Sequence, residues 1–268
     1  MLSRCRPLLG TFVEITADRE EAIEAGFDAV ERVHRLMSAH EPDSDVSRIN
    51  CTAHLRPIDV HDWTARVLER ALFWSGESEG AFDIVRAGKA ARERGLIPAH
   101  PEQPEPKAAH WTWFELQGSV ARLHQPGCID LGGIAKGFAV DRAIDALRKA
   151  GAQCGLVNAG GDVAGYGRAW PAQIVEPHER RPLAEVNLDG DALATSGLVD
   201  GAFGHLTGAD ARWISASVRA GTATDADALT KVLLSGSAVA EHCLGVAGAD
   251  GLRVTADGSI ESAAWVPA

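Results

Sequence analysis

The strand-like segments in the second half of this 268-residue chain are joined by links too short to hold a crossover helix. Parallel neighbouring strands need a crossover of a dozen or more residues, usually a helix, whereas antiparallel neighbours need only a tight turn. The short, glycine-rich links therefore favour an α+β protein with mixed, largely antiparallel sheets and flanking helices over a doubly wound parallel sheet. We expect such strands at residues 111–116, 120–123, 155–157, 172–175, 184–188 and 213–218.

Helices are indicated where apolar residues recur every three or four positions. The clearest case follows a predicted strand at 8–16, and Asp18 with Glu21 three residues later is typical of a helix start. Pro42 and a cluster of Asp and Ser residues then predict a loop over 41–50. Further helices are expected at residues 61–75, 136–149 and 227–234.

Four prolines between residues 98 and 106 make this segment a surface connection instead of a regular element. A chain of 268 residues is long enough for one large domain or for two closely packed ones. We find no internal repeat and no low-complexity tract. We therefore interpret residues 1–268 as a single domain, with an internal linker near 96–108 as the one candidate boundary.

The net charge of -11 argues against two classes of partner. No run of Lys or Arg offsets it, so neither nucleic acid nor an anionic membrane surface is expected to bind. No apolar stretch approaches the roughly 18 residues of a membrane span, and the first 16 residues lack a signal-peptide core. Five cysteines without paired spacing are typical of a reducing compartment. We therefore expect a cytoplasmic protein that does not insert into membranes.

The segment DLGGIAKGFAVDRA, residues 130–143, brings two glycines to the start of a predicted helix. Gly132 and Gly133 would let an anion approach the backbone at the helix N-terminus. The segment is not a Walker loop, because Lys136 precedes Gly137 instead of following the last glycine. A tight glycine turn with an exposed lysine explains the same residues equally well, so this segment alone leaves both interpretations open.

Three further segments combine glycines, hydroxyl groups and acids in an equally ambiguous way. VNAGGDV (157–163) carries a double glycine after a strand, which indicates close packing against a ligand or a hairpin turn. ALATSG (192–197) indicates a phosphate-binding turn or a helix cap, and His205 downstream is a base or a structural histidine. Asp225 and Asp227 open a predicted helix, where acids usually serve as caps, although a carboxylate there can also bind Mg²⁺.

In their order along the chain, these segments resemble the ApbE family, the FAD:protein FMN transferases. The resemblance extends over about residues 8–236, which is nearly the whole chain. In its first segment Leu9 stands where the family has Met. The resemblance is carried by LLGTFVEI, MSAHEPDSDVSRIN, EGAFD, DLGGIAKGFAVD, VNAGGDV, ALATSG, GHLTG and SVRAGTATDADAL.

The resemblance implies a reaction and a set of site residues. FAD would be split at its diphosphate, FMN would pass through a phosphoester bond to a Thr or Ser hydroxyl of an acceptor protein, and AMP would be released with Mg²⁺ assisting. The implied Mg²⁺ ligands are the Ala135 carbonyl and the Asp227 carboxylate, and the implied base is His205. Residues at positions that line the flavin nucleotide site are Thr11, Asn50, Asp130, Lys136, Gly160, Gly161, Thr195, Ser196 and Gly197.

One departure from the family pattern lies at the implied metal site. The family carries a threonine one helical turn after the aspartate, and here this position is Lys231. A charged lysine cannot ligate Mg²⁺, and Thr230 lies about 100° around the helix. We therefore expect the Lys231 ammonium to occupy part of the metal site, to pair with Asp227 and to act as a catalytic positive charge on the diphosphate. Transfer would then be weak or independent of Mg²⁺.

A second departure is the segment GHLTG, residues 204–208, which is shorter than the family's loop between the histidine and the Thr-Gly pair. This shortening changes the wall next to His205. The two departures leave two alternative functions open, because a shared family does not by itself fix the activity. One is a flavin-binding protein with weakened catalysis, and the other is an FAD pyrophosphatase that uses water and yields FMN and AMP.

Overall fold

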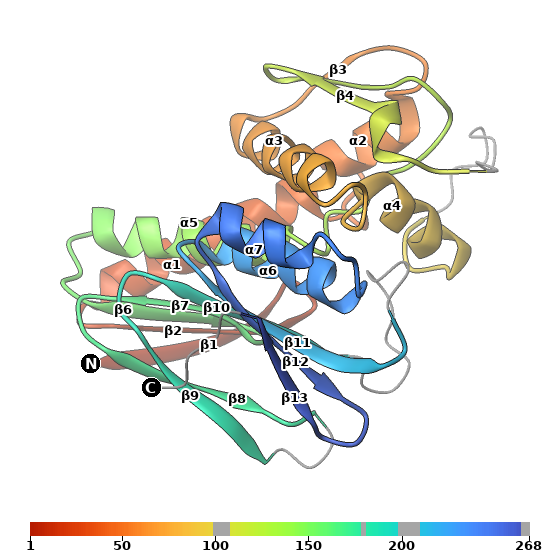
Figure 1. Cartoon of the computed structure of the whole chain (residues 1–268). Coiled ribbons are helices and arrows are strands. Elements are labelled where there is room, and N and C mark those ends of the chain that lie inside the picture. Colours follow the sequence, from red (N-terminus) through yellow and green to blue (C-terminus); the bar gives the residue numbers. More distant parts are fainter. Residues whose placement is uncertain (99–107, 178–180, 198–209, 264–268) are drawn as a thin grey trace.

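An eight-stranded sheet forms the base of the fold (Figure 1). The computed structural model describes residues 1–98, 108–177, 181–197 and 210–263. All neighbours in this sheet are antiparallel, which confirms the arrangement expected from the short links. In spatial order the strands are β1 (Leu2–Leu8), β2 (Thr11–Ala17), β6 (Gly155–Ala159), β7 (Asp162–Tyr166), β10 (Ala192–Gly197), β11 (Trp213–Ala220), β12 (Asp250–Thr255) and β13 (Ile260–Ala263).

Helices cover one face of this sheet (Figure 1). α1 (Glu20–Met37) and α5 (Ala135–Lys149) lie side by side, and α6 (Ala223–Leu234) contacts α5 and the strands β10 and β11. Nearly every side chain of α6 is buried, because neighbours enclose it on several sides. α7 (Ala240–Ala247) follows α6 and packs against it.

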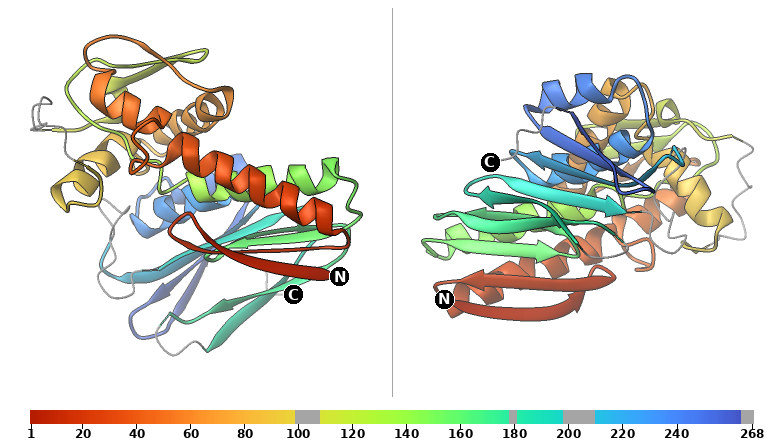
Figure 2. Two further views of the ribbon diagram at one scale, coloured as in Figure 1. Left: turned by 180° about the vertical axis from the view of Figure 1, so that it is seen from behind. Right: turned by 60° about the horizontal axis from the view of Figure 1, so that its bottom comes forward.

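A second group of elements lies beyond these helices, on the side away from the sheet (Figures 1 and 2). Fully buried Trp74 from this group belongs to the same hydrophobic cluster as Val13 and Ile15 of β2, so one core runs through both groups. The group consists of α2 (Asp45–Thr52), α3 (Asp62–Glu77), α4 (Ile84–Glu93), the 3₁₀ turn Trp111–Trp113 and a small sheet of β3 (Ile58–Asp59), β5 (Val120–Leu123) and β4 (Phe114–Gln117).

A two-stranded hairpin packs on the opposite face of the large sheet (Figure 1). Its strands are β8 (Trp170–Val175) and β9 (Pro182–Leu188). They bury a separate apolar cluster against side chains of β10 and β12, including Trp170, Ile174 and Leu193. The large sheet is therefore covered by helices on one face and in part by this hairpin on the other.

The predicted strand at 8–16 is wrong in one respect, because a turn at Leu9 and Gly10 divides it into β1 and β2. Both turn residues have positive φ, 56° and 70°, and Leu8 pairs directly with Thr11. Two central residues with positive φ are typical of the tight turn whose twist matches a β-hairpin. The β-branched residues had indicated one continuous strand and concealed this turn.

Helix boundaries account for the other corrections. The expected loop over 41–50 contains the start of α2, where the Ser44 side chain accepts a hydrogen bond from the Ser47 N–H. Asp18 does not cap α1, since its carboxylate accepts from the Gln153 N–H instead. α6 begins at Ala223, four residues before the predicted start. The predicted helices at 61–75 and 136–149 are confirmed within two residues.

The first three residues of the strand predicted at 111–116 form a 3₁₀ turn, whereas the other predicted strands lie within observed ones. Within the described ranges, we find no helix with the length and apolar character that crossing a bilayer requires.

Candidate functional site

α5 and α6 touch at Gly137 with no side chain between them. A Cβ atom on Gly137 would lie 2.1 Å from the carbonyl oxygen of Ala223, so only glycine allows this contact. Farther along α5, the Asp141 carboxylate accepts hydrogen bonds from the backbone N–H groups of Ala223 (2.8 Å) and Thr224 (2.9 Å). It thereby caps the N-terminus of α6. These contacts fix α6, and Asp227 with it, against the start of α5.

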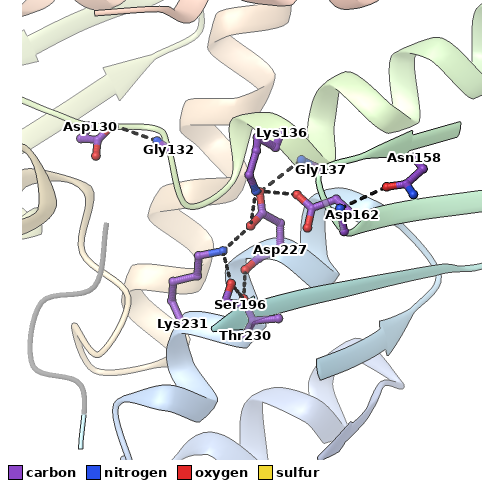
Figure 3. A network of polar contacts seen from close by, with 11 residues as sticks. Asp130, Gly132, Lys136, Gly137, Asn158, Asp162, Ser196, Asp227, Thr230 and Lys231 are labelled. Carbon is purple, nitrogen blue, oxygen red and sulfur yellow. Dashed lines mark hydrogen bonds and ion pairs between the residues drawn. The ribbon is translucent and has the colours of Figure 1, made fainter. Parts of the chain in front are cut away.

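Four buried or half-buried charges meet where α5, α6 and the β6–β7 turn come together (Figure 3). Lys136 Nζ donates to Asp162 Oδ2 at 2.6 Å and lies 3.4 Å from both carboxylate oxygens of Asp227. Lys231 Nζ donates to Asp227 Oδ1 from one turn farther along α6, which confirms the ion pair predicted from the sequence. We call Lys136, Asp162, Asp227 and Lys231 the charge quartet. Its positive and negative charges alternate in space.

Burial and charge act in opposite directions on the members of the quartet. Asp227 is 0% exposed, and burial alone would raise its pKa, but the ammonium groups of Lys136 and Lys231 hold that pKa well below its usual range. Burial and the nearby Asp227 carboxylate raise the pKa of Asp162. Burial lowers the pKa of Lys231, whereas the two carboxylates outweigh burial and raise the pKa of Lys136. Asp227 is therefore the ionised group around which both lysines are arranged.

Hydroxyl groups hold the Lys231 ammonium in place from the side of β10. Lys231 Nζ donates to Ser196 Oγ at 2.9 Å, and Ser196 Oγ lies 2.8 Å from the hydroxyl of Thr230. Thr230 in turn donates to the backbone carbonyl of Asp227 at 2.7 Å. Thr230 thus faces away from the Asp227 carboxylate, as its place on the helix predicted, and its role here is to position Ser196.

Two hollows share the lining residue Gly160, and Lys136 of the quartet lines the first of them. The first, which we call the helix-side hollow, has a volume of about 490 Å³ and is lined by the end of α1, the β1–β2 turn and residues 130–136. The second, the hairpin-side hollow, has a volume of about 670 Å³ and lies between β8 and the strands β6, β7, β10 and β11. Gly160 has φ 62°, and a Cβ there would lie 2.6 Å from Thr11 Oγ1. Glycine is therefore required where the hollows meet.

The structure distributes the predicted site residues over these features. Adjacent residues of a strand point to opposite faces, so Ser196 faces the quartet whereas Thr195 faces the hairpin-side hollow. His205 lies outside the described residues. The helix-side hollow is lined by Thr11, Asp130, Ala135, Lys136 and Gly160, and the hairpin-side hollow by Gly160, Gly161, Thr195 and Gly197.

Asn50 lines neither hollow. Its side-chain amide donates to the Ile129 carbonyl at 3.0 Å and accepts from the Ile129 N–H at 2.7 Å. Both groups of the amide are therefore used to hold the backbone that leads into Asp130. Next to it, Asp130 Oδ1 accepts from the Gly132 N–H at 2.9 Å and shapes the loop before α5. Asn50 thus positions the loop before α5 without lining either hollow.

Replacing Asn50 by Ala should lower the free energy of unfolding by about 2 kcal/mol, because it leaves the buried N–H and C=O of Ile129 without these partners. Urea unfolding followed by tryptophan fluorescence measures this change. Asn187→Ala, on the exposed face of β9, is the matched control and should have almost no effect. An equal loss in both variants would contradict this role of Asn50.

Two acids that hold the site together escaped the sequence prediction. Asp162 directly follows the Gly160–Gly161 pair and is the first buried residue after this tight turn. An acid at such a position was the available signal for a site residue. Asp141 directly follows the apolar residues 138–140 of α5, and no role was predicted for it from the sequence. Its partners on α6 lie more than eighty residues away in the sequence, so no local pattern could reveal its role as a cap.

The quartet does not fit a divalent metal ion. Magnesium prefers oxygen ligands in near-octahedral geometry. Asp227 Oδ1 accepts a hydrogen bond from Lys231, and Asp227 Oδ2 accepts one from the Gly137 N–H at 3.1 Å. Lys136 Nζ lies 3.4 Å from each of the two oxygens. Among the described residues, no group of three or more His, Cys, Asp or Glu side chains is arranged to hold a metal. Of the implied ligand pair, the Asp227 carboxylate thus already has two ammonium groups as partners.

The chain belongs to the ApbE family, whose family model matches residues 9–244. Two curated relatives are both named FAD:protein FMN transferase. The one from Haemophilus influenzae is 28% identical over 206 residues, covering 68% of this chain and 59% of the relative. The one from Treponema pallidum is 27% identical over 276 residues, covering 85% and 76%. This chain therefore spans little more than half the length of the first relative.

Solved structures share the fold. The ApbE protein from Thermotoga maritima superposes with a TM-score of 0.83 at 23% identity and covers 98% of this chain and 97% of its own. The flavin transferase ApbE from Vibrio cholerae gives a TM-score of 0.79 at 22% identity, covering 97% and 96%. At these identities the likeness establishes the arrangement of helices and antiparallel sheets, and no more than that.

Proposed function

We propose that this protein transfers FMN from FAD to a Ser or Thr hydroxyl of an acceptor protein and releases AMP. One observation carries the proposal: Gly160 lines both hollows, and the Lys136 side chain lines the helix-side hollow together with it. FAD consists of two ring systems joined by a diphosphate, which suits two hollows that share Gly160 and of which one is lined by the Lys136 ammonium group. Membership in the ApbE family and the names of the relatives support the same reaction.

In the proposed reaction, the acceptor oxygen forms a bond to the phosphorus of the FMN moiety while the bond from that phosphorus to the AMP oxygen breaks. Lys136 and Lys231 offset the negative charge that gathers on the phosphate oxygens. The glycine backbone at 160–161 lets these oxygens come close. The proton of the acceptor hydroxyl passes to a base, and we assign this role to His205 from the family resemblance.

The assay combines the protein, FAD and a pool of capped peptides that carry a central Ser or Thr. Covalent flavin fluorescence on peptides together with released AMP supports transfer. AMP with free FMN and no labelled peptide identifies an FAD pyrophosphatase. FAD that binds and stays intact identifies a flavin-binding protein without catalysis. Either of the last two results replaces the proposed function.

His205→Ala should lower the rate of AMP release about 10²- to 10⁴-fold, the usual contribution of a general base, without weakening FAD binding. The comparison variant is His242→Ala. The His242 imidazole lies on the exposed side of α7 and forms a hydrogen bond with Glu77 at the end of α3. This variant should keep the full rate. Unchanged AMP release in His205→Ala would remove the histidine from the mechanism.

We propose that the protein acts in the cytoplasm. None of its five cysteines, Cys5, Cys51, Cys128, Cys154 and Cys243, forms a disulfide in the part of the chain that the structure describes. Cysteines that stay out of disulfides are typical of a compartment that keeps thiols reduced.

A further inference from the structure

The Asp227 carboxylate already has two cationic partners within the protein, the ammonium groups of Lys231 and Lys136. Lys231 donates to one oxygen, Lys136 lies 3.4 Å from both, and the Gly137 N–H completes the set at 3.1 Å. Asp227 has no exposure to solvent. A buried carboxylate with this many donors is fully compensated, so it has little to gain from a further positive ion.

Lys231 is also nearly buried and has hydrogen-bond partners on two sides, which opposes its displacement by a metal ion. Its side chain is only 9% exposed, and Ser196 Oγ fixes the ammonium from the second side. The stem lies under the loop before α5, where a Cβ on Gly133 would come within 3.4 Å of Lys231 Cε. A divalent ion at Asp227 would therefore lie beside the Lys231 ammonium and close to that of Lys136, where repulsion between like charges opposes its binding.

We propose that this centre is a metal-free diphosphate site, in which the Lys231 ammonium, fixed by Asp227 and Ser196, provides the positive charge that a divalent ion would otherwise supply. The inference rests on the proposed function for its ligand, the diphosphate of FAD. An ammonium has three N–H groups, and Asp227 and Ser196 take two of them among the described residues. We assign the third to a phosphate oxygen, which would reach it through the 9% of the Lys231 side chain that is exposed.

The neighbourhood of Lys231 suits an anion. Lys136 lines the helix-side hollow and adds a second positive charge, while the N-terminus of the fifteen-residue α5 directs its partial positive charge to the same place. The carboxylates of Asp162 and Asp227 act to raise the pKa of both lysines, against the effect of burial, and Asp227 holds both ammonium groups in position. We therefore infer that FAD binds with equal affinity whether or not Mg²⁺ is present.

The experiment compares four proteins: the wild type, Lys231→Thr, Lys231→Met and Lys89→Thr. Lys89 forms an i,i+4 ion pair with Glu93 on α4, outside the site. Lys89→Thr therefore makes the same substitution in an ion pair of the same spacing. Binding of Mn²⁺, as a probe for Mg²⁺, is followed by electron paramagnetic resonance on the protein without FAD. The dissociation constant of FAD is measured by flavin fluorescence in EDTA and in Mg²⁺. Thermal unfolding verifies that each variant is folded.

The wild type and Lys89→Thr should bind no Mn²⁺ and should bind FAD equally well in EDTA and in Mg²⁺. In EDTA, both Lys231 variants should bind FAD about 10- to 100-fold more weakly, the loss expected for one charged hydrogen bond. Mg²⁺ should restore affinity in Lys231→Thr, because the new hydroxyl and the freed Asp227 oxygen lie one helical turn apart. It should not restore affinity in Lys231→Met, which gains no oxygen ligand.

Saturable Mn²⁺ binding to the wild type would overturn the inference, even if the Lys231 variants failed to fold. Wild-type FAD affinity that rises at least tenfold with Mg²⁺ would also overturn it, and so would a Lys231→Met variant that binds FAD like the wild type in EDTA. Failure of the proposed function looks different. In that case FAD does not bind, or AMP is not released, while the Mn²⁺ measurement still decides whether the centre excludes metal.

Discussion

Asp227→Ala should lower the free energy of unfolding by about 3–5 kcal/mol, the usual cost of removing one partner from a buried ion pair. Without this carboxylate, Lys231 keeps only Ser196 Oγ as a partner among the described residues, and the buried Gly137 N–H loses its acceptor. Burial already lowers the pKa of Lys231, so the lysine should also lose part of its charge. Urea unfolding gives the stability, and flavin fluorescence should detect at least a tenfold weaker affinity for FAD.

The double variant Asp227→Ala/Lys231→Met separates the lost pair from general damage to the core. It removes both charges together, so it should be more stable than Asp227→Ala alone, and the energies of the single variants should not add. Asp257→Ala, in an exposed turn, controls for the loss of an aspartate as such. If the double variant is less stable than Asp227→Ala, the interaction between Asp227 and Lys231 does not hold this centre together.

Elements whose patterns are local could be predicted from the sequence. Apolar residues that recur every three or four positions after Asp18 led to the correct helix α1, and the short links between strands led to the correct antiparallel arrangement. The Lys231–Asp227 pair was also predictable, because four residues along a helix bring two side chains to one face. In each case the interacting groups are separated by one helical turn or one tight link.

The remaining parts of the site depend on contacts between distant segments. Lys136 pairs with Asp162 and Asp227 from 26 and 91 positions away, and Asn50 bonds to Ile129 across 79 positions. Chain spacing carries no information about such contacts, so Asn50 was assigned to the ligand although its amide holds backbone. Thr195 and Ser196 point in opposite directions because they are neighbours in the strand β10. The prediction of a phosphate-binding turn or a helix cap at 192–197 was wrong, so the sequence could not separate the two side chains.

Gly137→Ala should lower the free energy of unfolding by about 3 kcal/mol, the upper part of the range for overpacked cores. The new methyl group would lie 2.1 Å from the Ala223 carbonyl oxygen and 2.9 Å from Asp227 Cβ. The first of these atoms is backbone, so relief requires that α5 and α6 move apart. That movement would lengthen the hydrogen bond from the residue 137 N–H to Asp227 and displace Lys136 and Lys231 relative to each other. FAD affinity should fall along with stability.

Gly245→Ala provides the matched control, because Gly245 also lies within a helix, α7, but a Cβ there meets no atom within 4 Å. Alanine favours helix over glycine, so this variant should be more stable than the wild type by about 0.5–1 kcal/mol. The same substitution thus has opposite signs at the two sites. Chemical unfolding of both variants, with flavin fluorescence for FAD binding, measures the contrast. A Gly137→Ala protein as stable as the wild type would contradict the close contact that places Asp227 between the two lysines.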